Sequence, residues 1–336
     1  MAILVTGGAG YIGSHTVVEL LNHNYDVVIL DNLSNSSADI IQKIELISKK
    51  KVTYYWGDVL DFTILEKIFS TNEITDVIHF AGLKSVAESI DKPLEYYRNN
   101  VSGVLAIIHL MQRHGVLNFI FSSSATVYGE PESIPLTESC RIGGTTNPYG
   151  TSKYIAELIL TDIAKANPKL HITLLRYFNP VGAHSSGLIG ESPKGIPNNL
   201  VPYLTRVANG KLECLSVFGK DYPTKDGTGV RDFIHVMDLA SGHIAAIRHR
   251  NKKNNLQIYN LGTGKGYSVL ELINVFERVT GASVNYEFCE RRPGDIAECW
   301  SDPALAERDL HWKAVRTLDD MMADVWAWEK NNITKC

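Results

Sequence analysis

The sequence Ala2-Ile3-Leu4-Val5-Thr6-Gly7-Gly8-Ala9-Gly10-Tyr11-Ile12-Gly13 opens the chain and decides its fold. Its first apolar residues predict a short buried strand, and a helical pattern then runs to about His23. Between strand and helix, the glycines allow a tight turn, a close approach of the backbone to a pyrophosphate, and close packing of helix on strand. The helix N-terminus would then face the phosphates of a dinucleotide.

A second apolar run, residues 26–30, ends in Asp31, which lies 18 residues after Gly13. An acid at the tip of the second strand can accept hydrogen bonds from both hydroxyls of an adenosine ribose, and it would repel a 2′-phosphate. The pattern therefore predicts NAD rather than NADP as the cofactor.

Short apolar runs alternate with helical patterns through the first half of the chain. This alternation predicts an α/β fold with a doubly wound, Rossmann-type parallel sheet joined by right-handed crossovers. Ligands bind such sheets at the carboxyl ends of the strands. Further strands are expected at 52–56, 75–79, 117–122, 170–177 and 257–261, and helices at 61–70, 93–114 and 149–167.

The character of the chain changes after Asn179. Residues 180–200 are rich in glycine, proline, serine and asparagine, which predicts a long loop that covers the substrate. We expect a dinucleotide-binding domain at 1–179 and a smaller α+β substrate lobe at 180–336, with residues 235–262 packing back on the sheet. In this half we expect a strand at 213–218, a polar loop at 221–229, and helices at 200–208, 235–248, 268–280 and 317–328.

The composition excludes several classes of protein. The 336 residues are 44% hydrophobic and carry a net charge of −4, with 33 basic and 37 acidic residues well mixed, so nothing favours nucleic acid. The five cysteines are scattered and the histidines show no ligand spacing, so neither disulfides nor a metal site is expected. No signal peptide and no membrane span is recognisable, which predicts a cytoplasmic protein.

Tyr149 and Lys153 place a phenol and an ammonium four residues apart, which on a helix puts both on one face. Asn147 and Pro148 predict an N-cap followed by proline at the first helical position, so Tyr149 falls in the first turn, where the helix dipole favours an anion. The ammonium and the dipole together predict that the pKa of the phenol is lowered from about 10 toward neutrality. Such a tyrosine would suit the work of a general base.

With these residues in place the chain resembles a known family. Residues 6–13, Ser122-Ser123-Ser124 and Tyr149-x-x-x-Lys153 are similar to the extended short-chain dehydrogenases/reductases. The resemblance narrows to the UDP-galactose 4-epimerases and runs from Met1 past Trp312. It is carried by residues 79–84, 121–129, 176–184, 195–200 and 226–232.

The resemblance implies an isomerase that inverts C4 of a UDP-hexose through a transient 4-keto sugar. Tyr149 would take the proton of the 4′-hydroxyl while the C4 hydride passes to NAD. Lys153 would keep Tyr149 ionisable and hydrogen-bond the nicotinamide ribose, and Ser124 would orient the 4′-oxygen. The keto sugar would then turn about its link to UDP and receive the hydride on its other face. NAD would be regenerated in each turnover and could stay bound.

The resemblance also implies the remaining site residues and a homodimer formed through the helices at 93–114 and 148–167. Arg231 and Arg292 suit a diphosphate because guanidinium groups match its oxygens in geometry and charge. The residues implied for NAD are Gly7, Gly10, Tyr11, Ile12, Gly13, Asp31, Asn32, Asn35, Ser36, Asp58, Val59, Phe80, Ala81, Gly82, Lys84, Asn99, Ser122, Tyr149, Lys153, Tyr177 and Phe178. Those implied for the UDP-sugar are Lys84, Ser124, Tyr149, Asn179, Asn199, Leu200, Phe218, Arg231, Arg292, Asp295 and Cys299.

Two positions depart from the family pattern. Cys299 stands where enterobacterial members specific for UDP-glucose and UDP-galactose look like they carry tyrosine, whereas members that also accept N-acetylated sugars have a small residue. The thiol would leave volume for a 2-acetamido group, so we expect turnover of UDP-GlcNAc and UDP-GalNAc as well; the alternative is a packing residue in a pocket closed by another side chain. Phe233 replaces a common tyrosine, at the cost of one hydrogen bond.

Other functions on this fold are disfavoured by particular residues. A nucleotide-sugar 4,6-dehydratase needs an Asp-Glu pair where this chain has Ala125 and Thr126. A sugar-acid decarboxylase or epimerase needs a cation for the substrate carboxylate, and the sequence singles out none. Asp31 argues against a reductase that consumes NADPH, and the intact set of catalytic residues argues against a non-catalytic NAD sensor. One alternative within the family is a UDP-GlcNAc 4-epimerase that serves polysaccharide synthesis, with UDP-glucose as a secondary substrate.

Overall fold

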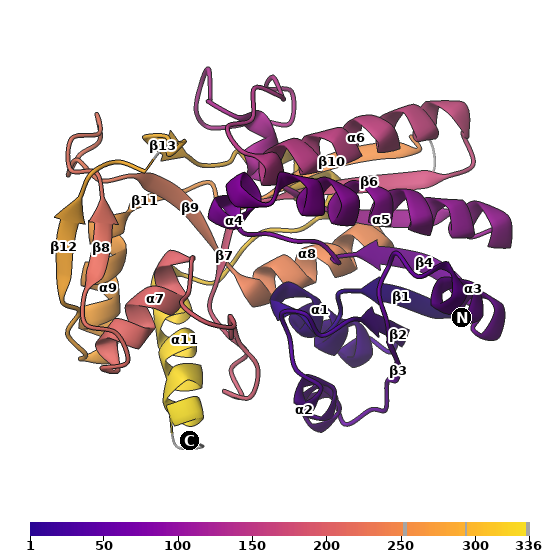
Figure 1. Ribbon diagram of the computed structural model, residues 1–336, viewed down its shortest axis with the longest axis horizontal. Helices are drawn as coiled ribbons and strands as arrows, with labels where there is room; N and C mark the ends of the chain where they lie inside the picture. The colour runs from indigo at the N-terminus through magenta and orange to yellow at the C-terminus, as the bar shows by residue number, and fades with distance from the viewer. Residues whose placement is uncertain (251–253, 293, 334–336) are drawn as a thin grey trace.

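Seven parallel strands form one central sheet in the computed structural model, which describes residues 1–250, 254–292 and 294–333 (Figure 1). Their order across the sheet is β10-β6-β5-β4-β1-β2-β3. The order reverses direction beside β1, so the sheet is doubly wound and the predicted fold class is confirmed. The strands are β1 (Ala2–Thr6), β2 (Asp26–Asp31), β3 (Thr53–Trp56), β4 (Ile74–His79), β5 (Asn118–Ser124), β6 (His171–Tyr177) and β10 (Leu256–Leu261).

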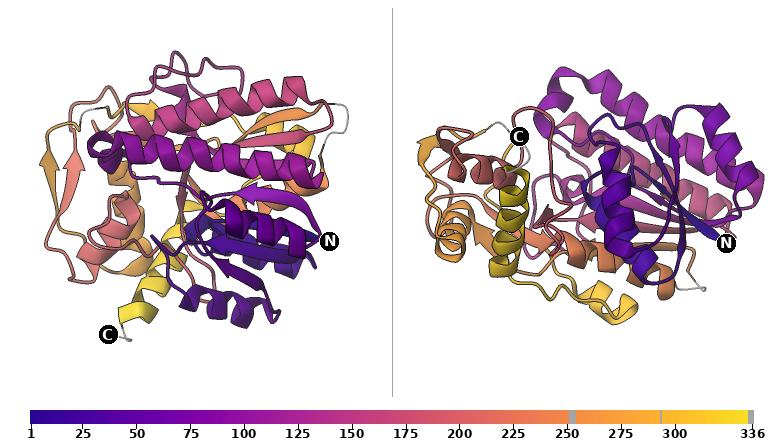
Figure 2. Two further views of the ribbon diagram at one scale, coloured as in Figure 1. Left: turned by 45° about the vertical axis from the view of Figure 1, so that its right-hand side comes forward. Right: turned by 90° about the horizontal axis from the view of Figure 1, so that it is seen from below.

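Helices cover both faces of this sheet (Figures 1 and 2). One face packs against α1 (Tyr11–Asn22), α2 (Asp39–Ser48), α8 (Val236–Arg248) and α10 (Ala304–Leu310). The other packs against α3 (Phe62–Thr71), α5 (Pro93–His114) and α6 (Pro148–Ala166), with the short helices α4 (Val86–Asp91) and η1 (Ala125–Tyr128) nearby. Residues from α8 and β10 thus return to the sheet after the chain has left it, and β10 pairs with β6 in parallel.

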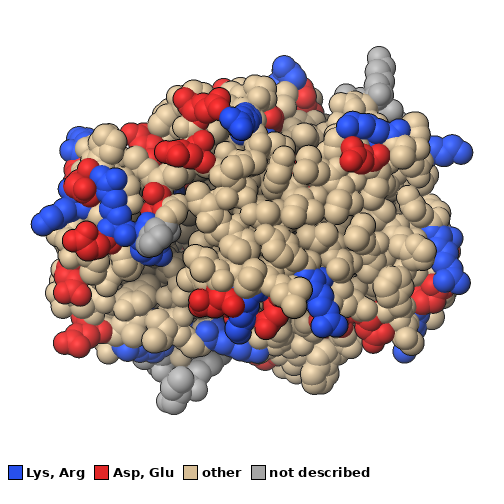
Figure 3. Space-filling view, turned by 45° about the horizontal axis from the view of Figure 1, so that its top comes forward, with Lys and Arg blue, Asp and Glu red and all other residues tan. Residues whose placement is uncertain are grey.

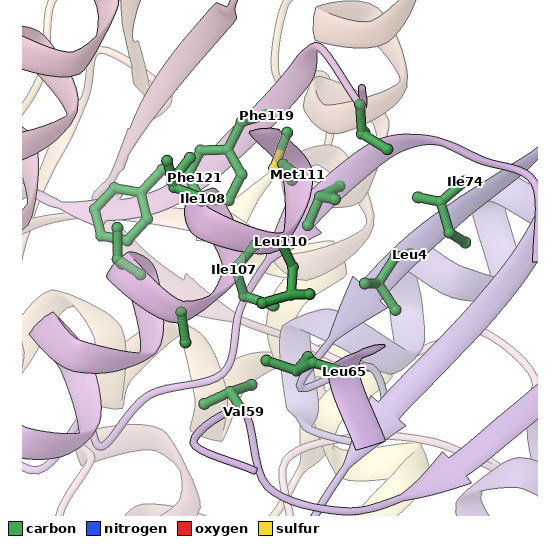
Figure 4. Close-up of a cluster of buried hydrophobic side chains, with 14 of the residues drawn as sticks. Leu4, Val59, Leu65, Ile74, Ile107, Ile108, Leu110, Met111, Phe119 and Phe121 are labelled. Carbon is green, nitrogen blue, oxygen red and sulfur yellow. The ribbon is translucent and has the colours of Figure 1, made fainter. Parts of the chain in front are cut away.

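Both faces of the central sheet are buried by helices, which is why its strands are continuous apolar runs in the sequence, and the core beneath α5 is an example. In Figure 4, Ile107 and Leu110 of α5 lie close to Leu4 of β1 and Leu65 of α3. All four side chains are at most 1% exposed. Each buried aliphatic side chain of this kind stabilises the fold by about 1.5–3 kcal/mol relative to the exposed state. The sheet is therefore a rigid platform for residues at its carboxyl edge.

The C-terminal lobe is built from short strands and three longer helices around its own core. Strands β11, β9 and β13 lie side by side, β7 also pairs with β9, and β12 pairs with β8. The elements are β7 (Asn179–Val181), α7 (Leu200–Ala208), β8 (Leu215–Phe218), β9 (Val230–His235), β11 (Gly266–Ser268), α9 (Val269–Thr280), β12 (Tyr286–Cys289), β13 (Glu298–Cys299) and α11 (Leu318–Ile333).

Among the described strands of this lobe only β8 was predicted, and β7, β9, β11, β12 and β13 were not. β7 lies in the stretch expected to be loop, and β9 lies between the expected loop at 221–229 and the expected helix at 235–248. That helix begins at Val236, because His235 serves as its N-cap and ends β9. β7 has only three residues and gains its partner from a segment more than fifty residues later, so no local pattern announces it.

Candidate active site

A cavity of about 960 Å³ lies at the carboxyl ends of the central strands, and residues of the sheet and of the C-terminal lobe both line it. Every residue predicted to contact cofactor or substrate lines this cavity except Asp58. Asp58 instead contacts a residue that lines the cavity: its Oδ2 accepts a hydrogen bond of 2.7 Å from Nδ2 of Asn32. Segments that are far apart in the sequence therefore converge on one space.

The glycine turn borders one end of the cavity. Gly7 has a φ of +71°, and a Cβ there would lie 2.7 Å from the backbone nitrogen of Ala81. A Cβ on Gly13 would lie 2.2 Å from the carbonyl oxygen of Gly7. Gly10 is the N-cap of α1 and brings no capping side chain, so the N-terminus of the helix stays accessible from the cavity. These features fit the pyrophosphate of a dinucleotide.

Asp31 ends β2 and shapes the loop that follows. Its Oδ2 accepts a hydrogen bond of 3.0 Å from the backbone nitrogen of Ala9. Its Oδ1 accepts one of 2.8 Å from the backbone of Leu33 and one of 3.0 Å from Oγ of Ser36. The carboxylate is only 8% exposed but lines the cavity, so it presents negative charge where an adenosine ribose would lie.

The start of α6 places Tyr149 as predicted. Asn147 is the N-cap, its Oδ1 accepts a hydrogen bond of 2.9 Å from the backbone of Gly150, and Pro148 is the first helical residue. Tyr149 therefore lies in the first turn and lines the cavity. The predicted lowering of its pKa is wrong, however. Burial raises the pKa of Tyr149 above its usual value and outweighs a hydrogen bond to Ser124 and the charge of Lys84, both of which act to lower it.

The ammonium of Lys153 contacts other groups, which is why it does not dominate the pKa of Tyr149. Its Nζ donates a hydrogen bond of 2.7 Å to the carbonyl oxygen of Ser122 and lies 4.8 Å from the ring centroid of Phe121. The side chain is 6% exposed. Burial lowers the pKa of Lys153 to about 8, and the nearby carboxylate of Glu157 opposes this shift. Lys153 can therefore change its charge close to neutral pH.

Ser124 is the last residue of β5 and holds the turn that follows. Its Oγ accepts hydrogen bonds from the backbone nitrogen of Thr126, at 3.2 Å, and from Oγ1 of the same residue, at 3.0 Å. Ser124 thereby caps η1 and remains on the cavity wall beside Tyr149. The carboxyl end of β5 and the first turns of α6 thus bring a hydroxyl, a phenol and an ammonium together.

A buried ion pair behind these residues was missed by the sequence analysis. Glu157, one helical turn after Lys153, receives two hydrogen bonds from Arg176, of 3.0 and 2.7 Å. Both side chains are at most 2% exposed. Ser123 donates to Oε1 of the same carboxylate, and Tyr128 accepts a bond of 3.0 Å from Arg176. The i, i+4 spacing of Lys153 and Glu157 was a signal for part of this network, but no sequence signal pointed to Ser123 on β5, Tyr128 on η1 or Arg176 on β6.

The substrate side of the cavity carries the predicted arginines. Arg231 lies on β9, and its Nη1 donates a hydrogen bond of 2.9 Å to the carbonyl oxygen of Val230. The guanidinium of Arg292 lies 4.7 Å from the ring centroid of Phe218, and its Nε donates a bond of 3.0 Å to Oδ2 of Asp295. Phe218, Arg292 and Asp295 thus contact one another, and both arginines line the cavity, where two guanidinium groups can receive a diphosphate.

Asp232 holds β9 in place and was also missed. Its fully buried carboxylate accepts hydrogen bonds from the backbone and hydroxyl of Thr263, the backbone of Gly264, and the backbone and hydroxyl of Ser301. Burial raises the pKa of Asp232, and these hydrogen bonds oppose the shift. The carboxylate therefore fixes the strand from which Arg231 enters the cavity.

Cys299 lies on β13 in register with Arg231 of β9. It is 9% exposed, packs in a cluster with Val127 and Phe178, and lines the cavity. Burial raises the pKa of its thiol to about 11, with Arg231 opposing, so the thiol stays protonated at neutral pH. Phe233, the second departure, is 3% exposed and also lines the cavity.

The described ranges hold no group of three or more histidine, cysteine, aspartate or glutamate side chains arranged for a metal ion. Within the same ranges, no helix has both the length and the apolar character needed to cross a bilayer. Of the five cysteines for which no disulfide was expected, Cys336 lies outside the described residues, and Cys140, Cys214, Cys289 and Cys299 are free thiols.

Residues 3–262 match the model of the NAD dependent epimerase/dehydratase family. The chain belongs to this family. Among its members, UDP-glucose 4-epimerase of Pasteurella multocida is 63% identical over 99% of this chain and 98% of that protein. The enzyme of the same name from Haemophilus influenzae is 62% identical with the same coverage. A crystal structure of UDP-glucose 4-epimerase from Bifidobacterium longum in complex with NAD+ and UDP is 54% identical, with a TM-score of 0.97 over 100% of both chains.

Proposed function

We propose that the protein is an NAD-dependent isomerase that interconverts UDP-glucose and UDP-galactose by inversion at C4. One observation carries this function: a single cavity joins the glycine turn to Arg231 and Arg292, with Ser124, Tyr149 and Lys153 between them. A dinucleotide and a UDP-sugar can thus lie in one space, with a proton-transferring phenol where they meet. The full-length identity to UDP-glucose 4-epimerases supports the same function.

The residues divide the work of proton transfer. The phenol of Tyr149 removes the proton from the 4′-hydroxyl, and Ser124, which shares a hydrogen bond with Tyr149, fixes the 4′-oxygen. Bound NAD supplies a reversible hydride acceptor for C4. When the keto sugar has turned its other face, Tyr149 returns the proton. No net oxidation results, so the product differs from the substrate only at C4.

The electrostatics of the cavity set what Tyr149 needs in order to ionise. Its pKa is raised by burial, so the phenolate requires nearby positive charge during the reaction. Lys84 supplies a lowering influence, and Lys153 lies one helical turn away with its pKa lowered to about 8. Below that pH the ammonium of Lys153 is present to stabilise negative charge on the phenol. We propose that Lys153 acts through charge and through a hydrogen bond to the nicotinamide ribose.

The two halves of the chain hold the two ligands. We propose that residues 1–179, joined by 235–262, bind NAD, and that the rest of 180–336 binds the UDP-sugar. Arg231 and Arg292 would receive the diphosphate, and Asp58 would act on the dinucleotide through Asn32. Support comes from β10, which joins the central sheet, and from the separate core of the lobe.

We also propose that the enzyme accepts UDP-GlcNAc and UDP-GalNAc. Cys299 is a small residue that packs in a cluster on the cavity wall. Its thiol takes up less of the cavity than the phenol ring of a tyrosine at this position would. A 2-acetamido group would occupy that volume. No observation favours the alternative of a UDP-GlcNAc 4-epimerase with UDP-glucose as a secondary substrate over the proposed function.

A homodimer in the cytoplasm completes the proposal. The helices α5 and α6 lie side by side, and they expose Leu94, Leu105 and Leu158. Figure 3 shows a broad area on this side without lysine, arginine, aspartate or glutamate. A second copy of the chain is the occupant that the proposal names, because a twofold pairing of the two helices would bury the area symmetrically. Sedimentation at low protein concentration should give twice the monomer mass, and a monomer would contradict this.

The function is tested with a panel of four UDP-hexoses and purified protein without added NAD. We expect UDP-glucose and UDP-galactose to interconvert, and the two N-acetylated sugars to interconvert as well. Failure with the first pair would contradict the proposed function. Failure with only the second pair would contradict the broad specificity and leave the function standing.

A further inference from the structure

The loop between β7 and α7, residues 182–199, lines the cavity with residues 190–194, 198 and 199 and crosses to the N-terminal half of the chain, which it contacts at several points. Its first residue, Gly182, accepts a hydrogen bond of 2.7 Å from the hydroxyl of Tyr11. Nζ of Lys194 donates to the carbonyl oxygens of Leu33 and Ser34, at 2.8 and 2.9 Å. We call this segment the crossing loop; it connects the elements labelled β7 and α7 in Figure 1.

Glu191 is the acidic residue of the crossing loop that faces the cavity, and it is 7% exposed. A single oxygen of its carboxylate, Oε1, accepts hydrogen bonds from Nζ of Lys84, at 2.7 Å, and from Nδ2 of Asn199, at 2.8 Å. Lys84 follows the central strand β4, whereas Asn199 is the N-cap position of α7 in the lobe. One carboxylate therefore joins the two sides of the cavity.

The charges explain why this contact holds. A buried carboxylate is costly unless it has a cation and hydrogen-bond donors, and Lys84 and Asn199 supply them. For Lys84, burial acts to lower the pKa, but the charge and hydrogen bond of Glu191 outweigh it and raise the pKa above its usual value. Glu191 therefore favours the charged form of Lys84, whose ammonium lies 5.9 Å from the ring centroid of Tyr11, at the glycine turn.

We infer that Glu191 is a positioning residue that couples the two ligand sites: a nucleotide held on the Asn199 side slows the release of NAD from the Lys84 side. The inference rests on the proposed function, in which the half of the chain that holds Lys84 binds NAD and the half that holds Asn199 binds the UDP-sugar. Contact of the nucleotide with Asn199 restrains Glu191, and Glu191 restrains Lys84 and the crossing loop over the cofactor. Such coupling is reciprocal, so bound NAD also tightens nucleotide binding.

The test measures exchange of bound NAD for labelled NAD in the holoenzyme, with and without saturating UDP, at a temperature where the parent exchanges within hours. For the parent, we expect UDP to slow exchange by about 5-fold or more, the lower end of typical coupling. In Glu191→Ala the ratio of the two rates should fall to about one. Glu191→Gln keeps an oxygen that can accept from Asn199 but lacks the charge for Lys84, so its ratio should lie between the two.

Lys194→Met is the matched control, because it removes a different polar contact of the same loop and should keep the parent ratio. If Glu191→Ala does not fold, Glu191→Gln, which conserves shape, still decides the matter. A parent ratio of one, or a parent-like ratio in both Glu191 variants, overturns the inference. Absence of epimerase activity in the parent would instead contradict the proposed function, so the two failures are distinguishable.

Discussion

The catalytic region at the carboxyl end of β5 and the substrate region on β9 and β13 are held in place differently. Lys153 lies one helical turn before Glu157, which forms a buried ion pair with Arg176, and their helix α6 packs against the central sheet. Arg231 and Cys299 lie on short strands that pair with each other over two residues, at the edge of a small lobe. The reaction thus depends on residues backed by a buried ion pair and the central sheet. The choice of sugar depends instead on single side chains, carried by short strands that the buried carboxylate of Asp232 fixes.

The largest expected effect is on the catalytic side. Tyr149→Phe removes the proton-transferring hydroxyl and should lower kcat by about 10²–10⁴-fold, the usual range for a general base. The amount of NAD that copurifies should not change, because the glycine turn is intact. Steady-state kinetics and cofactor content measure both. Tyr154→Phe on the same helix is the control and should keep the parent kcat. Only a small fall in kcat for Tyr149→Phe would show that the phenol of Tyr149 is not the general base.

The buried ion pair itself is the target of the second prediction. Arg176→Met leaves Glu157 buried without its cation, which should lower the free energy of unfolding by about 3–5 kcal/mol. Urea unfolding followed by circular dichroism measures the change. The double variant with Glu157→Leu should recover much of the loss, since no buried charge then remains. Equal destabilisation in single and double variants would show that the pair is not what stabilises this region.

The lowered pKa of Lys153 predicts how stability depends on pH. Its folded pKa is about 8, whereas an unfolded lysine titrates near about 10.4, so the unfolded chain binds more protons between these values. Stability contributed by this group should therefore rise with pH across that window, by at most about 1.4 kcal/mol per pH unit. In Lys153→Met this contribution should vanish. The prediction would be contradicted if the free energy of unfolding changed with pH equally in the parent and the variant from pH 8 to pH 10.

The substrate region should show the smallest effect on turnover and the clearest effect on choice of sugar. Cys299→Tyr should lower kcat/KM for UDP-GlcNAc by about 10-fold or more, as expected when a pocket loses the volume of a substrate group. Turnover of UDP-galactose should stay close to that of the parent. Cys299→Ser, which keeps the volume, is the control and should retain both activities. An equal fall with both sugars would mean that the ring disturbs the site rather than its selectivity.

The difference between the regions also decides what the sequence could predict. The glycine turn, Asp31, and the helix start at Asn147 follow from local backbone chemistry and periodicity, and the structure places each as expected. β9 was missed because its partners are short strands from distant segments. The buried contacts of Arg176 and Glu191 arise only when distant segments meet. The pKa of Tyr149 was misjudged because spacing reveals a neighbouring cation but not the degree of burial.

The proposed reaction oxidises C4 and reduces it again within one cavity while Tyr149 holds the proton. It is tested most directly with UDP-galactose that carries deuterium at C4, incubated with the purified protein and no added cofactor. We expect UDP-glucose that retains the deuterium at C4, observed by proton NMR and mass spectrometry. Product that has lost the deuterium to solvent would contradict it, because inversion would then proceed by proton exchange at C4 rather than by hydride transfer and return.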